Sequence, residues 1–147
     1  MTALLSSYDA TAGVRPAAAP PLGAAHGAPG LILRLEAAAA LAASLAFYAR
    51  SGEGWVMFGL LFLVPDLSML GYLAGRGVGA AAYNAAHSYL APAALGAVAL
   101  IFAPPHLLGI ALIWIAHIGF DRLLGYGLKY ATAFGDTHLG AKGVRSA

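Results

Sequence analysis

Several polar or charged residues lie inside segments of this chain that are otherwise apolar, and their types are those that bind metal ions or transfer protons. They are Glu36, Asp66, Asn84, His87, His117, Asp121 and Arg122. Imidazole and carboxylate ligands together suit zinc or iron, and histidine can also relay protons near neutral pH. His117 and Asp121 are four residues apart and share one helix face, as do Asn84 and His87, which are three apart.

The composition indicates that these residues belong to a membrane protein. Of 147 residues, 61% are hydrophobic and 10% are charged, whereas soluble domains carry about 25% charged residues. The mean hydropathy is +0.77. The absence of cysteine excludes disulfides and thiolate chemistry. A net charge of +2 without a basic run gives no indication of nucleic-acid binding, so the expected partner is the lipid bilayer.

Four apolar segments are long enough to cross the hydrocarbon region, which takes about 20 residues. They cover residues 31–49, 55–75, 79–103 and 106–131. The connections between them are short, so neighbouring helices must run in opposite directions. The sequence therefore predicts an all-α membrane protein, an antiparallel four-transmembrane-helix bundle within residues 31–134.

The two ends of the chain are predicted to lie outside this bundle. Residues 1–30 are rich in Ala, Pro and Gly, and their prolines prevent a long helix, so we expect a disordered tail that folding does not require. Residues 135–147 are expected to form a C-terminal tail. We expect His138, which lies in this tail, to be a solvated loop residue, although it could fold back onto the bundle.

Basic residues predict the orientation. If both termini are cytoplasmic, the other side holds only Arg50, and the cytoplasmic side holds Arg15, Arg34, Arg76, Arg122, Lys129, Lys142 and Arg145. This asymmetry follows the excess of positive charge in cytoplasmic loops. The prediction is a multi-pass membrane protein with both termini cytoplasmic.

Prolines and small residues modify the predicted helices. Pro65 and Pro92 lie inside spans and should kink them, and Pro65 directly precedes Asp66. Gly71, Gly75 and Gly79 recur every four residues. Such small faces let helices approach closely, either within the chain or in a homo-oligomer.

Depth along the predicted helices brings the polar residues together. With a rise of about 1.5 Å per residue, Asp66, His87 and Asp121 lie roughly 12–14 Å from the inner ends of their helices. His117 is one turn further in, and Glu36 falls near the same layer. Unpaired charges inside a membrane cost a few kcal/mol each, so we expect these faces to meet inside the bundle.

Three interpretations of this layer stay open. In the first, a divalent metal such as zinc or iron is bound by Asp66, His87, His117 and Asp121. Glu36 is then a fifth ligand or a base, with Asn84, Arg122, Tyr72 and Tyr126 around the site. A metal would support hydrolytic or redox chemistry on a small or lipid-derived substrate. In the second, the carboxylates pair with Arg122 and the histidines and only fix helix packing, without catalysis. In the third, the layer is a proton or ion relay.

Three stretches of the sequence resemble a known family. "LFLVPDLSMLGYLAG", "GAAAYNAAHSYLAP" and the fourth-span pattern beginning "LIWIAHIGFDRLLGYGLKY" and ending "THLG" are similar to the DUF4260 family of small bacterial membrane proteins. The resemblance covers roughly residues 31–140 and implies an integral protein of the bacterial inner membrane with about four helices. The family brings no established activity, so no catalytic residue is carried over.

Overall fold

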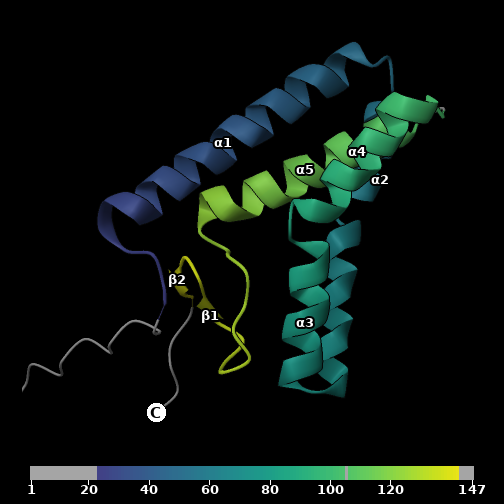
Figure 1. Ribbon diagram of the computed structural model, residues 1–147. Helices are drawn as coiled ribbons and strands as arrows, with labels where there is room; N and C mark the ends of the chain where they lie inside the picture. The colour runs from purple at the N-terminus through teal and green to yellow at the C-terminus, as the bar shows by residue number, and fades with distance from the viewer. Residues whose placement is uncertain (1–22, 105, 143–147) are drawn as a thin grey trace, which may run out of the picture.

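The computed structural model describes residues 23–104 and 106–142 (Figure 1). Within these residues the helices, in chain order, are α1 (Gly27–Arg50), α2 (Trp55–Phe62), the 3₁₀ helix η1 (Val64–Ala74), α3 (Arg76–Ala86), α4 (Leu90–Phe102) and α5 (Leu107–Leu124). A short antiparallel hairpin follows, formed by β1 (Asp136–Thr137) and β2 (Gly140–Ala141).

These helices form four spans. Gly27–Arg50, Trp55–Ala74, Arg76–Phe102 and Leu107–Leu124 are each long and apolar enough to cross a membrane. Large apolar side chains point outward from them, and Leu73 and Leu90 are 88% and 81% exposed. A soluble monomer rarely exposes such a surface, whereas lipid covers it. The predicted four-helix membrane fold is confirmed, and the protein is a multi-pass membrane protein.

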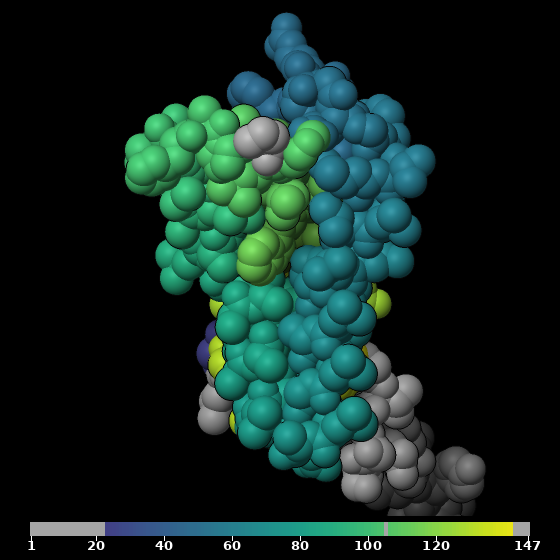
Figure 2. Space-filling model, turned by 90° about the vertical axis from the view of Figure 1, so that its right-hand side faces the viewer, coloured from purple at the N-terminus to yellow at the C-terminus, as the bar shows by residue number. Residues whose placement is uncertain are grey.

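Helix α5 is the central element of the bundle. It packs against α1, α2 and α4, while η1 and α3 pack chiefly against each other. Figure 2 shows η1 and α3 as a column extending from the rest of the molecule. Gly119 lets α5 approach α1 closely, since a Cβ there would lie 2.9 Å from the carbonyl oxygen of Ala37. The buried face of α5 continues through His117 and Ile118.

Two of the four spans are broken, as their prolines predict. The span 55–75 consists of α2 and η1, with Pro65 in the first turn of η1. The span 79–103 consists of α3 and α4, separated at residues 87–89, with Pro92 in the first turn of α4. Proline is accepted in a first turn because its missing N–H has no helical partner there. Each break lies beside a residue of the predicted polar layer, Asp66 or His87.

The small residues of the second and third spans are used inside the chain. A Cβ on Gly79 would overlap the ring of Tyr72, and a Cβ on Gly71 would lie 2.9 Å from Ala82. The close approach of η1 and α3 therefore depends on these glycines. This is the within-chain packing that their spacing allows.

The helix ends differ from the predicted ones. Helix α1 begins at Gly27 rather than residue 31, because Pro29 falls in its first turn, where proline is tolerated. Helix α5 ends at Leu124 rather than residue 131, because Gly125 adopts the left-handed conformation (φ +89°) that terminates helices. The predicted tail thus overlaps α1 at residues 27–30. Its residues 1–22, like residues 143–147, lie outside the described part of the chain.

The C-terminal segment folds back onto the bundle. The N–H of Ala25 donates a 2.7 Å hydrogen bond to the carbonyl oxygen of His138, so the two ends of the described chain meet on one side. His138 Nδ1 accepts a 2.7 Å hydrogen bond from the N–H of Leu128. The expectation of a solvated loop histidine is therefore wrong, and the alternative, a segment folded back, is right.

Candidate metal centre

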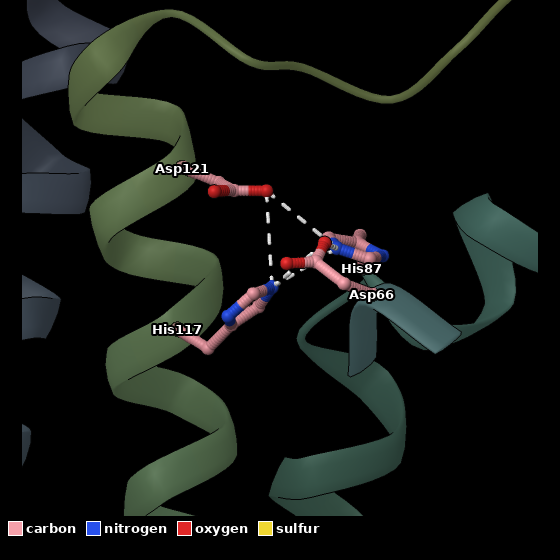
Figure 3. Close-up of side chains that lie close together, drawn as sticks. All are labelled: Asp66, His87, His117 and Asp121. Atoms are coloured by element: carbon pink, nitrogen blue, oxygen red, sulfur yellow. Dashed lines mark hydrogen bonds and ion pairs between the residues drawn. The ribbon is translucent and has the colours of Figure 1, made fainter. Parts of the chain in front are cut away.

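Two aspartates and two histidines converge inside the protein (Figure 3). One ligand atom from each of Asp66, His87, His117 and Asp121 lies within 4.8 Å of all the others. Both histidines are buried, with 3% and 2% of their surfaces exposed. The predicted convergence of these four side chains is confirmed, and neither histidine faces lipid.

The spacing of the four atoms fits a single ion. His87 Nε2 lies 3.1 Å from His117 Nε2, 3.4 Å from Asp66 Oδ1 and 3.5 Å from Asp121 Oδ2. His117 Nε2 lies 3.6 Å from Asp66 Oδ1 and 3.8 Å from Asp121 Oδ2. Tetrahedral zinc with ligands at 2.0–2.1 Å holds neighbouring ligand atoms roughly 3.3 Å apart. The cluster therefore needs only small movements to bind zinc.

The ligands come from three segments: two project from a continuous helix, and two stand where helices are interrupted. His117 and Asp121 project from one face of the continuous helix α5, as their spacing of four residues predicts. Asp66 stands in the first turn of η1, directly after Pro65. His87 is the residue that terminates α3, with φ −107° and ψ 14°. The two breaks place these last side chains against α5.

Side chains of α5 satisfy the carbonyl groups that one break leaves free. Trp114 Nε1 donates a 2.6 Å hydrogen bond to the carbonyl oxygen of Ala86. Arg122 Nη2 donates to the carbonyl oxygen of His87 at 3.3 Å. Unsatisfied backbone groups inside a membrane are costly, so these two bonds stabilise the break and hold His87 in place.

Tyr83 supports the cluster from two directions. Its carbonyl oxygen lies 3.0 Å from His87 Nδ1, which directs Nε2, the other ring nitrogen, towards the cluster. Its ring stacks on the His87 ring with centroids 3.7 Å apart. Its hydroxyl donates to Asp121 Oδ2 at 3.1 Å. Tyr83 was not among the site residues predicted from the sequence, although its spacing of four residues from His87 could have indicated a shared face.

Asn84 has a different role from the predicted one beside the metal. Its side-chain amide donates to the carbonyl oxygen of Lys129 at 2.9 Å and accepts from the N–H of Lys129 at 2.6 Å. This paired contact fixes the segment that follows α5. Lys129 is consequently only 8% exposed, and its Nζ donates to the carbonyl oxygen of Phe134 at 3.0 Å.

Lys129 faces a polar cavity that opens beside the cluster. The cavity has a volume of about 240 Å³, and Asp66, Tyr83, Asp121 and Tyr126 also line it. Burial lowers the pKa of Lys129 below its ordinary value, although the carboxylates of Asp121 and Asp66 oppose this shift. Tyr126, predicted to lie around the site, is 45% exposed at the edge of this cavity.

The structure does not bring Glu36 or Arg122 into contact with the four ligand atoms. Glu36 is exposed on α1 and lines a separate cavity of about 170 Å³ together with Arg122, Tyr89 and His138. The guanidinium carbon of Arg122 lies 4.5 Å from the centre of the Tyr89 ring. Adjacent residues on a helix point about 100° apart, which directs Arg122 away from the face of Asp121.

Tyr72, the remaining predicted neighbour of the site, belongs to the packing of η1. Its ring meets that of Phe134 edge-on with centroids 5.0 Å apart. Its hydroxyl is buried and has no hydrogen-bond partner among the described residues. Tyr72 therefore contributes to the packing of η1 against α3 and against the segment after α5.

Comparison with known proteins places this arrangement in a family. Residues 30–141 match the domain of unknown function DUF4260. The chain belongs to the DUF4260 family. The matched range contains all four ligands of the candidate metal centre, so the site is part of the DUF4260 domain and not of the flanking segments. The comparisons with curated proteins and with solved structures each find no match.

Proposed function

We propose that this protein binds a divalent metal ion, zinc in the first instance, at Asp66, His87, His117 and Asp121 and catalyses hydrolysis within the membrane. The observation that supports this most strongly is the near-tetrahedral spacing of four ligand atoms, 3.1–3.8 Å across the five measured pairs. Three separate chain segments supply them. Such convergence is more specific than the spacing of His117 and Asp121 alone.

The electrostatics of the cluster also favour an ion. Two carboxylates lie close together in a region of low dielectric, where like charges repel strongly. The packing alternative pairs the carboxylates with Arg122 and the histidines, but the Arg122 guanidinium donates to the His87 carbonyl and lies over Tyr89. This leaves the pairing to two buried imidazoles whose Nε2 atoms are 3.1 Å apart, where two positive charges would repel. The relay alternative is served better by a line of groups across the membrane than by a compact cluster. A divalent ion offsets both carboxylates.

The exposed fractions of the four ligand side chains indicate which of them acts as the catalytic base. Structural zinc sites are closed by four protein ligands, whereas catalytic sites keep one position open. The Asp66 side chain is 35% exposed, compared with 17% for Asp121 and 4% and 2% for the histidines. Asp66 also lines the polar cavity. We therefore assign Asp66 as the carboxylate that leaves the ion or binds it weakly and acts as the base.

The reaction that follows is addition of water across an ester or amide bond. Zinc held by His87, His117 and Asp121 would supply a water of pKa near 7. Asp66 would accept a proton from the attacking water while the water oxygen forms a bond to the carbonyl carbon. The bond from that carbon to the leaving oxygen or nitrogen then breaks, and Asp66 returns the proton to the leaving group. The products are a carboxylic acid and an alcohol or amine.

Metal content tests the proposal directly. We expect protein purified in mild detergent without a polyhistidine tag to contain close to one zinc per chain by elemental analysis. His87→Ala and His117→Ala should both abolish it. Glu36→Ala is the matched control, because it removes a carboxylate outside the cluster, and it should retain the metal. Iron in place of zinc would indicate redox chemistry, since zinc has none.

Folded wild-type protein that contains no metal and takes up none from added zinc, iron or manganese would contradict the proposal. The packing alternative would then stand. Retention of metal by both histidine variants would also contradict it.

We also propose that both termini are cytoplasmic, in the bacterial inner membrane, on the basis of the basic residues described above. The chain has no cysteine, so single cysteines report sidedness without background. Gly54→Cys and Gly77→Cys are suitable, because a Cβ at either position meets nothing within 4 Å. In intact cells a membrane-impermeant maleimide should label position 54 and not position 77. The opposite labelling would refute the orientation.

A further inference from the structure

An apolar cavity lies beside the part of α5 that precedes His117. It has a volume of about 230 Å³ and lies among η1, α3 and α5, where Pro65, Ala86, Ile113 and Trp114 line it. Two of these residues are direct chain neighbours of metal ligands, Pro65 of Asp66 and Ala86 of His87. The cavity therefore borders both breaks, one residue before Asp66 and one residue before His87.

The two cavities follow one another along α5. Ile113 lies four residues before His117, about 6 Å along the helix, and Asp121 lies four residues after it, again about 6 Å. Ile113 lines the apolar cavity and Asp121 lines the polar one. A single elongated molecule lying along α5 would pass from an apolar wall, past the cluster, to a polar wall.

Ser68, one of the residues that line the apolar cavity, carries a hydroxyl group. Ser68 Oγ is buried and has no hydrogen-bond partner among the described residues. Helical serines usually bond a carbonyl one turn back, and buried polar groups are normally satisfied. This hydroxyl can donate to a polar atom of a molecule bound in the cavity.

Lys129, which lines the polar cavity, supplies a positive charge that can select the headgroup of a bound amphiphile. With a divalent ion offsetting Asp66 and Asp121, Lys129 leaves the cavity with one uncompensated positive charge. Two hydrogen bonds between the side-chain amide of Asn84 and the backbone of Lys129 hold Lys129 in this position. An anionic group is the complementary ligand.

We infer that the substrate is an anionic amphiphile from the membrane. Its hydrocarbon chain occupies the apolar cavity, its anionic headgroup lies near Lys129, and the bond between the two lies at the metal. This inference rests on the proposed function and narrows it to an acyl ester or acyl amide of an anionic headgroup. Hydrolysis of that bond releases a fatty acid from one cavity and the headgroup alcohol or amine from the other.

The fluorescence of Trp114 can report binding of the hydrocarbon chain in the apolar cavity. The protein has two tryptophans, and Trp55→Phe leaves Trp114, which lines the apolar cavity. Bromine quenches tryptophan fluorescence on contact. In nanodiscs of zwitterionic lipid, with zinc present, we expect 11-bromoundecylphosphonate to quench Trp114 saturably. The probe has an anionic headgroup and no bond that the protein can hydrolyse. The cationic analogue 11-bromoundecyltrimethylammonium should bind about tenfold more weakly or worse.

Two pairs of variants in the Trp55→Phe background locate the binding site. Ala86→Phe fills the apolar cavity and should abolish saturable quenching, whereas Ala85→Phe, on an exposed neighbouring position, should not. Lys129→Gln should weaken binding of the phosphonate about tenfold, whereas Arg50→Gln, at the far end of α1, should not. Circular dichroism confirms that each variant is folded.

Equal quenching by the anionic and cationic probes, or an equal effect of Ala86→Phe and Ala85→Phe, would overturn this inference. Zinc content measured on the same samples separates it from the proposed function. A chain that contains zinc and fails to bind the phosphonate overturns only the substrate class. A chain that binds the phosphonate and contains no zinc overturns the proposed hydrolysis and leaves the amphiphile site standing.

Discussion

The continuous helix α5 and the two broken spans beside it each supply half of the candidate metal centre, and they do so differently. In α5, helix periodicity alone puts His117 and Asp121 on one face. In the broken spans, Asp66 and His87 stand at the points where regular α-helix stops. A residue at a break can point in a direction that an unbroken helix does not allow, but its neighbours lose hydrogen bonds.

Helix α5 compensates for that loss, which makes the two regions dependent on each other. Trp114 and Arg122 bond the carbonyl groups of Ala86 and His87 at the second break. Irregular backbone at membrane depth is tolerated only where protein or a water-filled cavity satisfies it. The regular helix therefore supplies two ligands and also the donors that keep a third ligand in place.

The largest expected effect comes from comparing the aspartates of the two regions. Asp121 lies on α5, is 17% exposed and accepts a hydrogen bond from Tyr83, whereas Asp66 lies at a break and is 35% exposed. A preorganised ligand contributes more affinity. We expect Asp121→Asn to weaken zinc binding by more than about 100-fold and Asp66→Asn by about tenfold.

Competition with a chelator of known affinity measures the zinc dissociation constant of each variant. Asp66→Asn should also abolish hydrolysis even when saturated with zinc, because the amide cannot accept the proton. The comparison between the two regions fails if Asp66→Asn loses as much zinc affinity as Asp121→Asn, or if zinc-saturated Asp66→Asn retains turnover.

The sequence predicted all four ligands of the candidate site and one residue that lies outside it. Depth and periodicity were sufficient to group Asp66, His87, His117 and Asp121, because all four lie in one layer. They were also sufficient to suggest Glu36, which has the right depth but lies on an exposed face of α1. Depth is one coordinate, and the direction of a side chain around its helix depends on packing that no single segment determines.

The side-chain hydrogen bonds to backbone carbonyl groups at the breaks could not be predicted from depth and periodicity. Pro65 and Pro92 predicted that the second and third spans are interrupted, and they are. The partners of the freed groups depend on which side chains the neighbouring helix presents. The spacing of three residues between Trp114 and His117 is compatible with a shared face, but the bond from Trp114 to Ala86 depends on the tertiary arrangement.

A smaller effect is expected when the compensation from α5 is removed. Trp114→Phe keeps most of the ring packing and deletes the N–H that bonds the Ala86 carbonyl at 2.6 Å. A buried carbonyl left without a donor costs about 1–3 kcal/mol, so we expect the free energy of unfolding to fall by that amount. Titration with a denaturing detergent, followed by circular dichroism, measures it.

Trp55→Phe is the matched control, because Trp55 is 57% exposed and its ring contacts those of Tyr48 and Phe58. Its free energy of unfolding should stay within about 0.5 kcal/mol of the wild-type value. Equal destabilisation by the two variants would show that the Ala86 carbonyl does not depend on α5.

The smallest expected effect concerns His138, which lies within the predicted C-terminal tail of residues 135–147. Burial lowers the pKa of His138 below its ordinary value of about 6.5, and the charge of Arg122 lowers it further. Its Nδ1 must be unprotonated to accept the hydrogen bond from Leu128. As the pH falls below about 6.5, the unfolded chain binds a proton that the folded chain resists, so stability is full above this pH and declines below it.

Other groups also titrate in this range, so the contribution of His138 is measured by difference. His138→Gln keeps a hydrogen-bond acceptor and removes the titration. We expect wild-type protein to lose more stability than His138→Gln between pH 7.5 and pH 5.5, by less than about 1 kcal/mol because the side chain is only half-buried. Thermal unfolding of both proteins in the same detergent at the two pH values measures this difference. An identical loss in both proteins would mean that protonation of His138 does not weaken the contact that returns the C-terminal segment to α5.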